Sequence, residues 1–286
     1  MNGLLIVDKP AGKTSHDVVA ICRRLLGERR IGHAGTLDPD ATGVLVLGVG
    51  RATRLLQYLE AHDKTYRATA VFGVETTTQD SAGDVVARAD ASGITPRAVE
   101  AALEQFRGEI DQVPPMVSAV KVGGERLYRK ARRGEDVERP ARRVVVHEFE
   151  LESFDPPAFR IRCSKGTYVR TLVHDLGAAL GVGAHVATLR RTAVGPFVET
   201  DAVSLDAVGP ASVRPMEDAV VGYPRRDVSS AEATALAQGK RIDGAGIEGL
   251  HAVVGPAGLV AVVREEAGST RPVCVVTEPQ QAGAAR

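Results

Sequence analysis

One stretch, residues 32–43, constrains the chain most, because it combines backbone-breaking residues with reactive side chains. It reads Gly-His-Ala-Gly-Thr-Leu-Asp-Pro-Asp-Ala-Thr-Gly, so its glycines and its proline force an irregular loop. The apolar run 44–47 that follows predicts a buried strand. A stiff polar loop anchored by a strand can hold one side chain still for chemistry. We expect Asp38 to be that side chain, with His33 and Asp40 as the alternatives inside the loop.

Length and charge limit the architecture and the partners. The chain has 286 residues, of which 44% are hydrophobic and 25% charged, as in ordinary globular proteins. A broken, proline-containing stretch over 205–224 predicts a linker, so we expect a large domain over 1–224 and a small one over 225–286. Because 36 basic residues balance 36 acidic ones, any polyanionic partner must be bound by local patches.

The cysteines and histidines exclude several kinds of site. Cys22, Cys163 and Cys274 are odd in number and widely spaced, which favours a reducing, cytoplasmic compartment and excludes a disulfide framework. The histidines show no helical pairing at metal-ligand spacing, so no metal site is predicted. The N-terminal apolar run is too short for a signal sequence, and no later run predicts a membrane span.

Hydrophobic periodicity predicts strands and helices in alternation, with Tyr66 on the apolar face of its strand. An arginine, Arg170, lies in the first turn of a predicted helix, where it opposes the helix dipole, so we expect it to have a carboxylate partner. The expected strands cover 4–7, 44–47, 64–74, 144–151, 159–163, 185–194, 251–254, 259–263 and 273–276. The expected helices cover 15–27, 52–59, 96–106, 167–180 and 229–238.

A basic segment follows the third helix of this series. Residues 121–143 carry nine basic and four acidic side chains, a net charge of +5. A solvated charged surface and a protruding arm that grips a phosphate backbone explain this composition about equally well from the residues alone.

Four motifs occur in a fixed order: Gly32-His-Ala-Gly-Thr-Leu-Asp-Pro39, Lys64-Thr-Tyr66, Pro115-Met-Val-Ser-Ala-Val-Lys121 and Lys165-Gly-Thr-Tyr-Val-Arg170. Together they resemble the bacterial tRNA pseudouridine-55 synthase family over about the first 200 residues. The resemblance, with the element pattern, implies an α+β fold with a mixed, mostly antiparallel sheet flanked by helices. It also implies a small β-rich C-terminal domain of the PUA type.

The resemblance further implies an isomerase that needs no cofactor and acts on the T-arm stem-loop of tRNA. Its uridine would be flipped out of the stack, and the glycosidic bond would be broken and re-formed at C5. In the family pattern, Asp38 carries the reacting carboxylate, Tyr66 stacks on the uracil, and Arg170 pairs with the aspartate. The pattern assigns substrate binding to His33 and Tyr168 and to the basic arm over about 113–143, namely Lys121, Arg129, Lys130, Arg132 and Arg133.

Two other functions compete with this hypothesis. A non-catalytic RNA-binding protein or tRNA-folding chaperone on the same fold would bind tRNA without Asp38-dependent conversion. A metal-dependent hydrolase using His33, Asp38 and Asp40 would lose activity in chelator. For the isomerase we expect a monomer that requires no protein partner and no membrane.

Overall fold

The structure, a computed structural model, describes residues 1–118, 121–122, 124–127, 133, 135 and 137–278. They form two compact units. Unit 1 comprises Met1–Pro39, Val44–Ala61 and the chain from Pro196 onward, and unit 2 comprises Asp40–Gly43 and His62–Gly195. The loop 32–43 is therefore divided, with Asp38 in unit 1 and Gly43 in unit 2.

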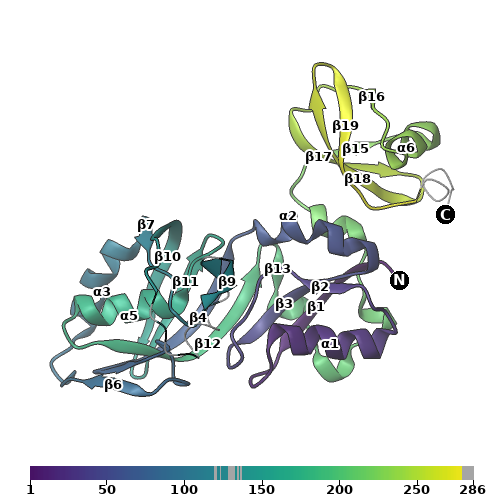
Figure 1. Ribbon diagram of the computed structural model, residues 1–286. Helices are drawn as coiled ribbons and strands as arrows, with labels where there is room; N and C mark the ends of the chain where they lie inside the picture. Colours follow the sequence, from purple (N-terminus) through teal and green to yellow (C-terminus); the bar gives the residue numbers. More distant parts are fainter. Residues whose placement is uncertain (119–120, 123, 128–132, 134, 136, 279–286) are drawn as a thin grey trace. The chain divides into compact units, whose positions relative to one another are not determined.

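Unit 1 is built around the buried strand that the sequence predicts after this loop. Its small sheet has the strand order β14-β1-β3, and β2 pairs antiparallel with β3. The strands are β1 (Gly3–Lys9), β2 (Ile31–His33), β3 (Thr42–Val49) and β14 (Val203–Ser204). One helix, α1 (Ser15–Leu26), packs on this sheet through Val18, Val19 and Cys22 (Figure 1).

The sequence predicts both ends of α1 correctly. Thr14 forms a capping box with Asp17, and Gly27 ends the helix with a φ of 62°. The apolar spacing of the helix also predicts Leu25 on its buried face, which is wrong because Leu25 is 49% exposed. At about 100° per residue Leu25 lies beyond Val18, at the margin of the face that Val19 and Cys22 occupy.

The segment predicted to be a linker consists of short 3-10 turns. Leu205 and Val208 pack in the same core as β1 and α1, and Leu4 exchanges two backbone hydrogen bonds with Arg214. The remaining short helices of unit 1 before its C-terminal sheet are η1 (Gly50–Leu55), α2 (Leu56–Glu60), η3 (Glu199–Asp201), η4 (Leu205–Ala207), η5 (Pro210–Ser212) and η6 (Met216–Val220). A two-residue strand, β13 (Phe197–Val198), precedes η3.

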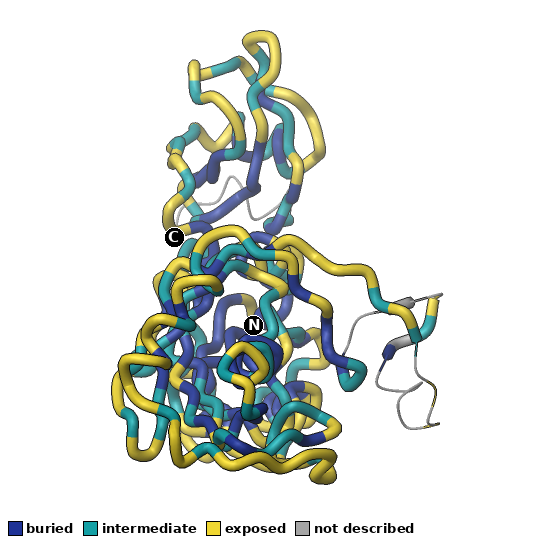
Figure 2. Tube along the Cα trace, turned by 90° about the vertical axis from the view of Figure 1, so that its left-hand side faces the viewer, coloured by how far each residue is buried: buried dark blue, intermediate teal, exposed yellow. Residues whose placement is uncertain are grey.

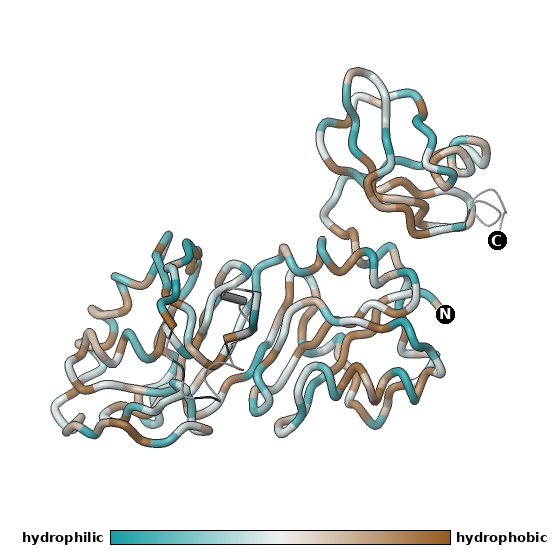
Figure 3. Tube along the Cα trace, in the orientation of Figure 1, coloured by the Kyte–Doolittle hydropathy of each residue, from teal (hydrophilic) through white to brown (hydrophobic). Residues whose placement is uncertain are grey.

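A second sheet closes the C-terminal part of unit 1, with the order β15-β17-β18-β19-β16. Its own apolar core joins α6 to β17 and β18 through Leu236, Val253 and Val260, and part of this sheet is coloured as hydrophobic in Figure 3. The predicted capping box between Ser229 and Glu232 is present. The elements are β15 (Arg225–Asp227), α6 (Ser230–Ala237), β16 (Ile242–Asp243), β17 (Gly249–Gly255), β18 (Gly258–Glu266) and β19 (Ser269–Val275).

Unit 2 is a longer sheet with the order β12-β4-β11-β10-β7, all antiparallel, while the first residues of β3 pair parallel with β12. Its strands are β4 (Lys64–Phe72), β7 (Gly108–Gln112), β10 (Arg142–Phe154), β11 (Pro157–Cys163) and β12 (Ala184–Val194). Short hairpins and helices add β5 (Val74–Thr76), β6 (Val85–Arg88), α3 (Pro96–Leu103), η2 (Glu104–Phe106), β8 (Lys121–Val122), β9 (Glu125–Arg126) and α5 (Val169–Ala179). These sheets and helices confirm the α+β fold with a mixed, mostly antiparallel sheet and a small C-terminal β structure.

Burial follows this architecture. Strands β1 and β3 are almost wholly buried, and Figure 2 shows such buried stretches alternating with exposed ones along the chain. Within the described ranges, no helix combines the length and the apolar content that crossing a bilayer requires.

The structure explains why position 43 of the loop 32–43 is a glycine. Gly43 has a φ of 101°, and a Cβ placed there would lie 2.2 Å from the carbonyl oxygen of Arg191. Only glycine fits, because both the backbone conformation and the neighbouring strand exclude a side chain. Gly43 thus lets the end of the loop approach β12 closely.

Candidate functional site

The backbone on both sides of Asp38 is held by buried side chains of unit 1. Ser15, at the start of α1, donates its hydroxyl to the carbonyl oxygen of Leu37 at 3.1 Å and accepts from the Leu37 N–H at 2.8 Å. Lys9, at the end of β1, donates from Nζ to the carbonyl oxygen of Pro39 at 2.7 Å. Both side chains are buried, and Lys9 also binds the carbonyls of Pro10 and Lys13. The residues before and after Asp38 are therefore anchored to the scaffold.

The other two polar residues of the loop differ in position. His33 is half-buried at the end of β2, where its backbone lies opposite Leu47 of β3. Asp40 is exposed, which fits a turn residue better than a reacting acid. We therefore retain Asp38 as the candidate nucleophile or base.

Tyr66 lies in unit 2, on the buried face of β4. Alternation along the strand buries Tyr66, Ala68 and Ala70, as the sequence predicts. In the sheet register Tyr66 lies opposite Ile161 of β11 and Arg191 of β12. The ring is 9% exposed, so packing fixes the side chain while a small part of its surface stays accessible.

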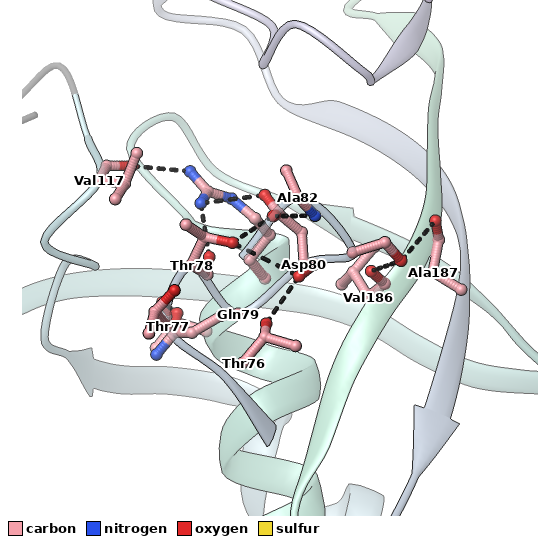
Figure 4. A network of polar contacts seen from close by, with 12 residues as sticks. Thr76, Thr77, Thr78, Gln79, Asp80, Ala82, Val117, Val186 and Ala187 are labelled. Atoms are coloured by element: carbon pink, nitrogen blue, oxygen red, sulfur yellow. Dashed lines mark hydrogen bonds and ion pairs between the residues drawn. The ribbon is translucent and has the colours of Figure 1, made fainter. Parts of the chain in front are cut away.

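Arg170 is 3% exposed, and three acceptors of unit 2 surround its guanidinium. Nη1 donates to the carbonyl oxygen of Thr78 at 2.7 Å and lies 3.2 Å from Asp80 Oδ2, and Nη2 donates to the carbonyl oxygen of Val117 at 2.9 Å. Figure 4 shows Thr78, Asp80 and Val117 converging on one guanidinium. The expectation of a carboxylate partner is confirmed, and that partner in unit 2 is Asp80.

Asp80 is itself oriented for this contact. Its Oδ1 accepts from the hydroxyl of Thr78 and from the N–H of Ala82, so Oδ2 is left to face Arg170 (Figure 4). The turn that carries it is fixed to β12 by the bond from the Ser81 N–H to the carbonyl oxygen of Val186. The sequence alone does not single out Asp80 among the acidic residues of 75–92.

Tyr168 is the residue before α5, and its backbone is held by Gln112 at the end of β7. The Tyr168 N–H donates to Gln112 Oε1 at 2.7 Å, and Gln112 Nε2 donates back to the Tyr168 carbonyl oxygen at 3.1 Å. Gln112 is buried, so this pair fixes where α5 begins. The prediction that Asp38, Tyr66 and Arg170 line one cleft stays a prediction.

The basic arm is described in part. Arg129, Lys130 and Arg132 lie outside the described residues, and Lys121 belongs to the short strand β8. Arg133 is exposed and pairs with two acids, donating to both oxygens of Glu125 at 2.8 Å and to Glu135 at 2.6 Å. Two acidic residues of the segment thus pair directly with Arg133, and the count of charges alone does not reveal this pairing.

Burial shifts the protonation of several groups. Burial raises the pKa of the Cys22 thiol to about 11 and that of the Cys163 thiol to about 12, so both stay protonated at neutral pH. Neither is suited to act as a thiolate nucleophile. Burial also raises the pKa of Asp175 on α5, and the neighbouring His174 opposes that shift.

Models of known protein families match most of the chain. The family model described as TruB family pseudouridylate synthase (N terminal domain) matches residues 23–169. The models for the tRNA pseudouridylate synthase B C-terminal domain and for tRNA Pseudouridine synthase II, C terminal, match 170–232 and 223–277. These matches confirm the family resemblance of the four motifs.

Curated relatives extend over almost the whole chain. The tRNA pseudouridine synthase B of Thermobifida fusca (strain YX) is 50% identical, covering 96% of this chain and 98% of that protein. That of Mycobacterium sp. (strain KMS) is 48% identical, covering 97% and 96%. Among solved structures, a chain in the crystal structure of a Cbf5-Nop10-Gar1 complex is 28% identical, with a TM-score of 0.76, over 99% of this chain and 87% of that one.

Proposed function

The chain belongs to the TruB family of pseudouridylate synthases, and from this we propose that it converts the T-loop uridine at position 55 of tRNA into pseudouridine. The observation that carries the proposal is the near full-length identity of 48–50% to curated tRNA pseudouridine synthases B. The reaction is an isomerisation, in which the bond from the base nitrogen to C1′ breaks and a bond from C5 to C1′ forms. It requires no oxidant, no hydrolytic water and no cofactor.

Asp38 is the residue that reacts in this proposal. With a reference pKa of about 4, an aspartate is ionised at neutral pH and can act as nucleophile or base. Its neighbours Leu37 and Pro39 are held by Ser15 and Lys9, which supports a role that needs a fixed carboxylate. The family resemblance gives Arg170 the role of orienting this carboxylate. That role is supported by the firm hold on its guanidinium, which Asp80 and two carbonyls provide.

The other residues make the uridine accessible. A base in the T-loop is stacked, and extruding it takes a few kcal/mol. His33 occupies or opens the space that the base leaves, and Tyr66 stacks on the flipped uracil, which its fixed and slightly exposed ring supports. Tyr168, whose backbone Gln112 fixes, contacts the same nucleotide.

We propose that the segment 113–143 contacts the phosphate backbone of the T-arm. Neutralising the four central basic residues should weaken tRNA binding and flatten its dependence on salt, because fewer counterions are released. The four are Arg129, Lys130, Arg132 and Arg133. An unchanged slope of binding constant against salt concentration would contradict this role.

The decisive experiment incubates the protein with an unmodified tRNA transcript without added cofactor and maps pseudouridine in the product. We expect conversion at the T-loop uridine, in the presence of chelator as well as in its absence. Asp38→Asn should abolish conversion and retain tRNA binding, and Asp40→Ala is the matched control in the same loop. Equal conversion by Asp38→Asn and the parent would refute the assignment of Asp38.

The proposal also covers the domain bounds, the oligomeric state and the cellular location of the protein. We propose that residues 1–224 form the catalytic domain and 225–286 a PUA-like RNA-binding domain, which the separate core around Leu236 supports. The protein acts as a monomer in the cytoplasm, and its three cysteines are buried and unpaired, as a reducing compartment allows. Light scattering during size-exclusion chromatography, with and without tRNA, tests the monomer.

A further inference from the structure

The loop around Asp38 is held by Ser15, a buried side chain that is not among the proposed site residues. Ser15 is 1% exposed, and its hydroxyl bonds both the N–H and the carbonyl oxygen of Leu37. It does not cap α1, because Thr14 does so through its own hydroxyl and Asp17. The described hydrogen bonds of the Ser15 side chain therefore serve the loop rather than the helix.

Peptide planarity makes this contact consequential for Asp38. The carbonyl oxygen of Leu37 lies in the same rigid plane as the N and Cα of Asp38, so fixing that oxygen fixes the plane from which Asp38 emerges. The Pro39 carbonyl, which Lys9 holds, fixes the next anchored plane. Between the two planes, the proline ring fixes one torsion at about −65°, which leaves the two torsions of Asp38 and ψ of Pro39.

We propose that Ser15 is a positioning residue for the reaction, which sets the backbone of Asp38 through Leu37. This inference rests on the proposed function of Asp38. Without the hydroxyl, the peptide plane before Asp38 loses its anchor and the carboxylate samples a wider range of positions. Displacements of about 1 Å from a reactive geometry can slow a reaction about 100-fold.

The test compares Ser15→Ala with Thr14→Ala, the adjacent substitution that weakens the same helix and leaves the bonds to Leu37 intact. We expect Ser15→Ala to lower kcat at saturating tRNA by about tenfold or more, with Kd for tRNA within about twofold of the parent. Thr14→Ala should keep the parent kcat. Amide hydrogen exchange in a peptide spanning 34–41 should accelerate in Ser15→Ala and stay unchanged in Thr14→Ala.

The measurements distinguish a positioning role of Ser15 from a purely structural one. If the kcat of Ser15→Ala is within about twofold of that of Thr14→Ala, Ser15 has a structural role only and the inference fails. Should Ser15→Ala not fold, as judged by circular dichroism, Ser15→Cys replaces it under the same criteria, since a thiol is a weaker donor and acceptor. Parent activity in Asp38→Asn, measured alongside, would instead refute the assignment of Asp38, and a parent protein that forms no pseudouridine would refute the proposed function.

Discussion

Replacing Asp80 by alanine tests how Arg170 is held in unit 2. The two charges lie 3.2 Å apart, and the side chains are 3% and 23% exposed. At an effective dielectric constant of about 20, two unit charges at this distance attract by about 5 kcal/mol. In the variant the two carbonyl bonds to Thr78 and Val117 remain, and water can enter beside the partly exposed site. We therefore expect the free energy of unfolding to fall by about 2–4 kcal/mol.

The assay is thermal unfolding together with the rate of pseudouridine formation. A loss of this size should lower the melting temperature by about 5–10 °C for a unit of this length. Since the proposed function gives Arg170 the role of orienting the reacting carboxylate, we expect a less firmly held guanidinium to lower the rate about tenfold. Asp80→Asn should have a smaller effect on both, since Asn keeps an acceptor for Thr78 and Ala82.

Asp84→Ala is the matched control, because Asp84 is exposed in the same turn region. Asp84→Ala should change neither the melting temperature nor the rate of pseudouridine formation. If Asp80→Ala melts and reacts like Asp84→Ala, then the charge of Asp80 does not hold Arg170, and the reasoning about charge is wrong.

Two further predictions concern the fold. Gly43→Ala should lower the free energy of unfolding, measured in urea, by more than Gly12→Ala does. Both positions have a positive φ, but only a Cβ at Gly43 would meet a backbone atom, the Arg191 carbonyl oxygen. Equal losses of stability in the two variants would contradict the packing argument. Asp175→Asn should raise the melting temperature at pH 7. Burial raises the pKa of Asp175, so its ionised form opposes folding as the pH rises through the raised pKa. The gain should vanish near pH 3, below the ordinary carboxyl pKa of 3.8, and an equal gain at both pH values would refute this cause.

The sequence predicts the cores well because periodicity records burial directly. Alternation places Tyr66 on the buried face of β4, and the capping residues Thr95 and Ser229 mark the starts of α3 and α6. Such signals involve residues close in sequence, so one chain suffices to read them. Leu25 shows their limit, because a leucine at the margin of a helix face has the same spacing as one at its centre.

Contacts between distant residues are not readable in this way. Arg170 needs an acid, but Asp80, Asp84 and Asp90 all lie in the same polar stretch, and only the turn held by Ser81 selects Asp80. The pairing of Arg133 with Glu125, eight residues earlier, likewise cannot be read from the charges along the segment. Composition reports the net charge of a segment and not the pairing within it.

The start of α5 shows how a local conflict in the sequence can indicate a function. No side chain caps this helix, its first turn has no acidic residue, and Arg170 places a positive charge near the positive end of the dipole. Each feature is unfavourable by about 1 kcal/mol, so local preferences alone would not begin a helix there. Gln112 holds the backbone of Tyr168, and Asp80 with two carbonyls holds Arg170, so tertiary contacts outweigh these preferences. A position that needs such support is expected where a side chain is required for chemistry, which is why the conflict at Arg170 predicts an important residue before any partner is known.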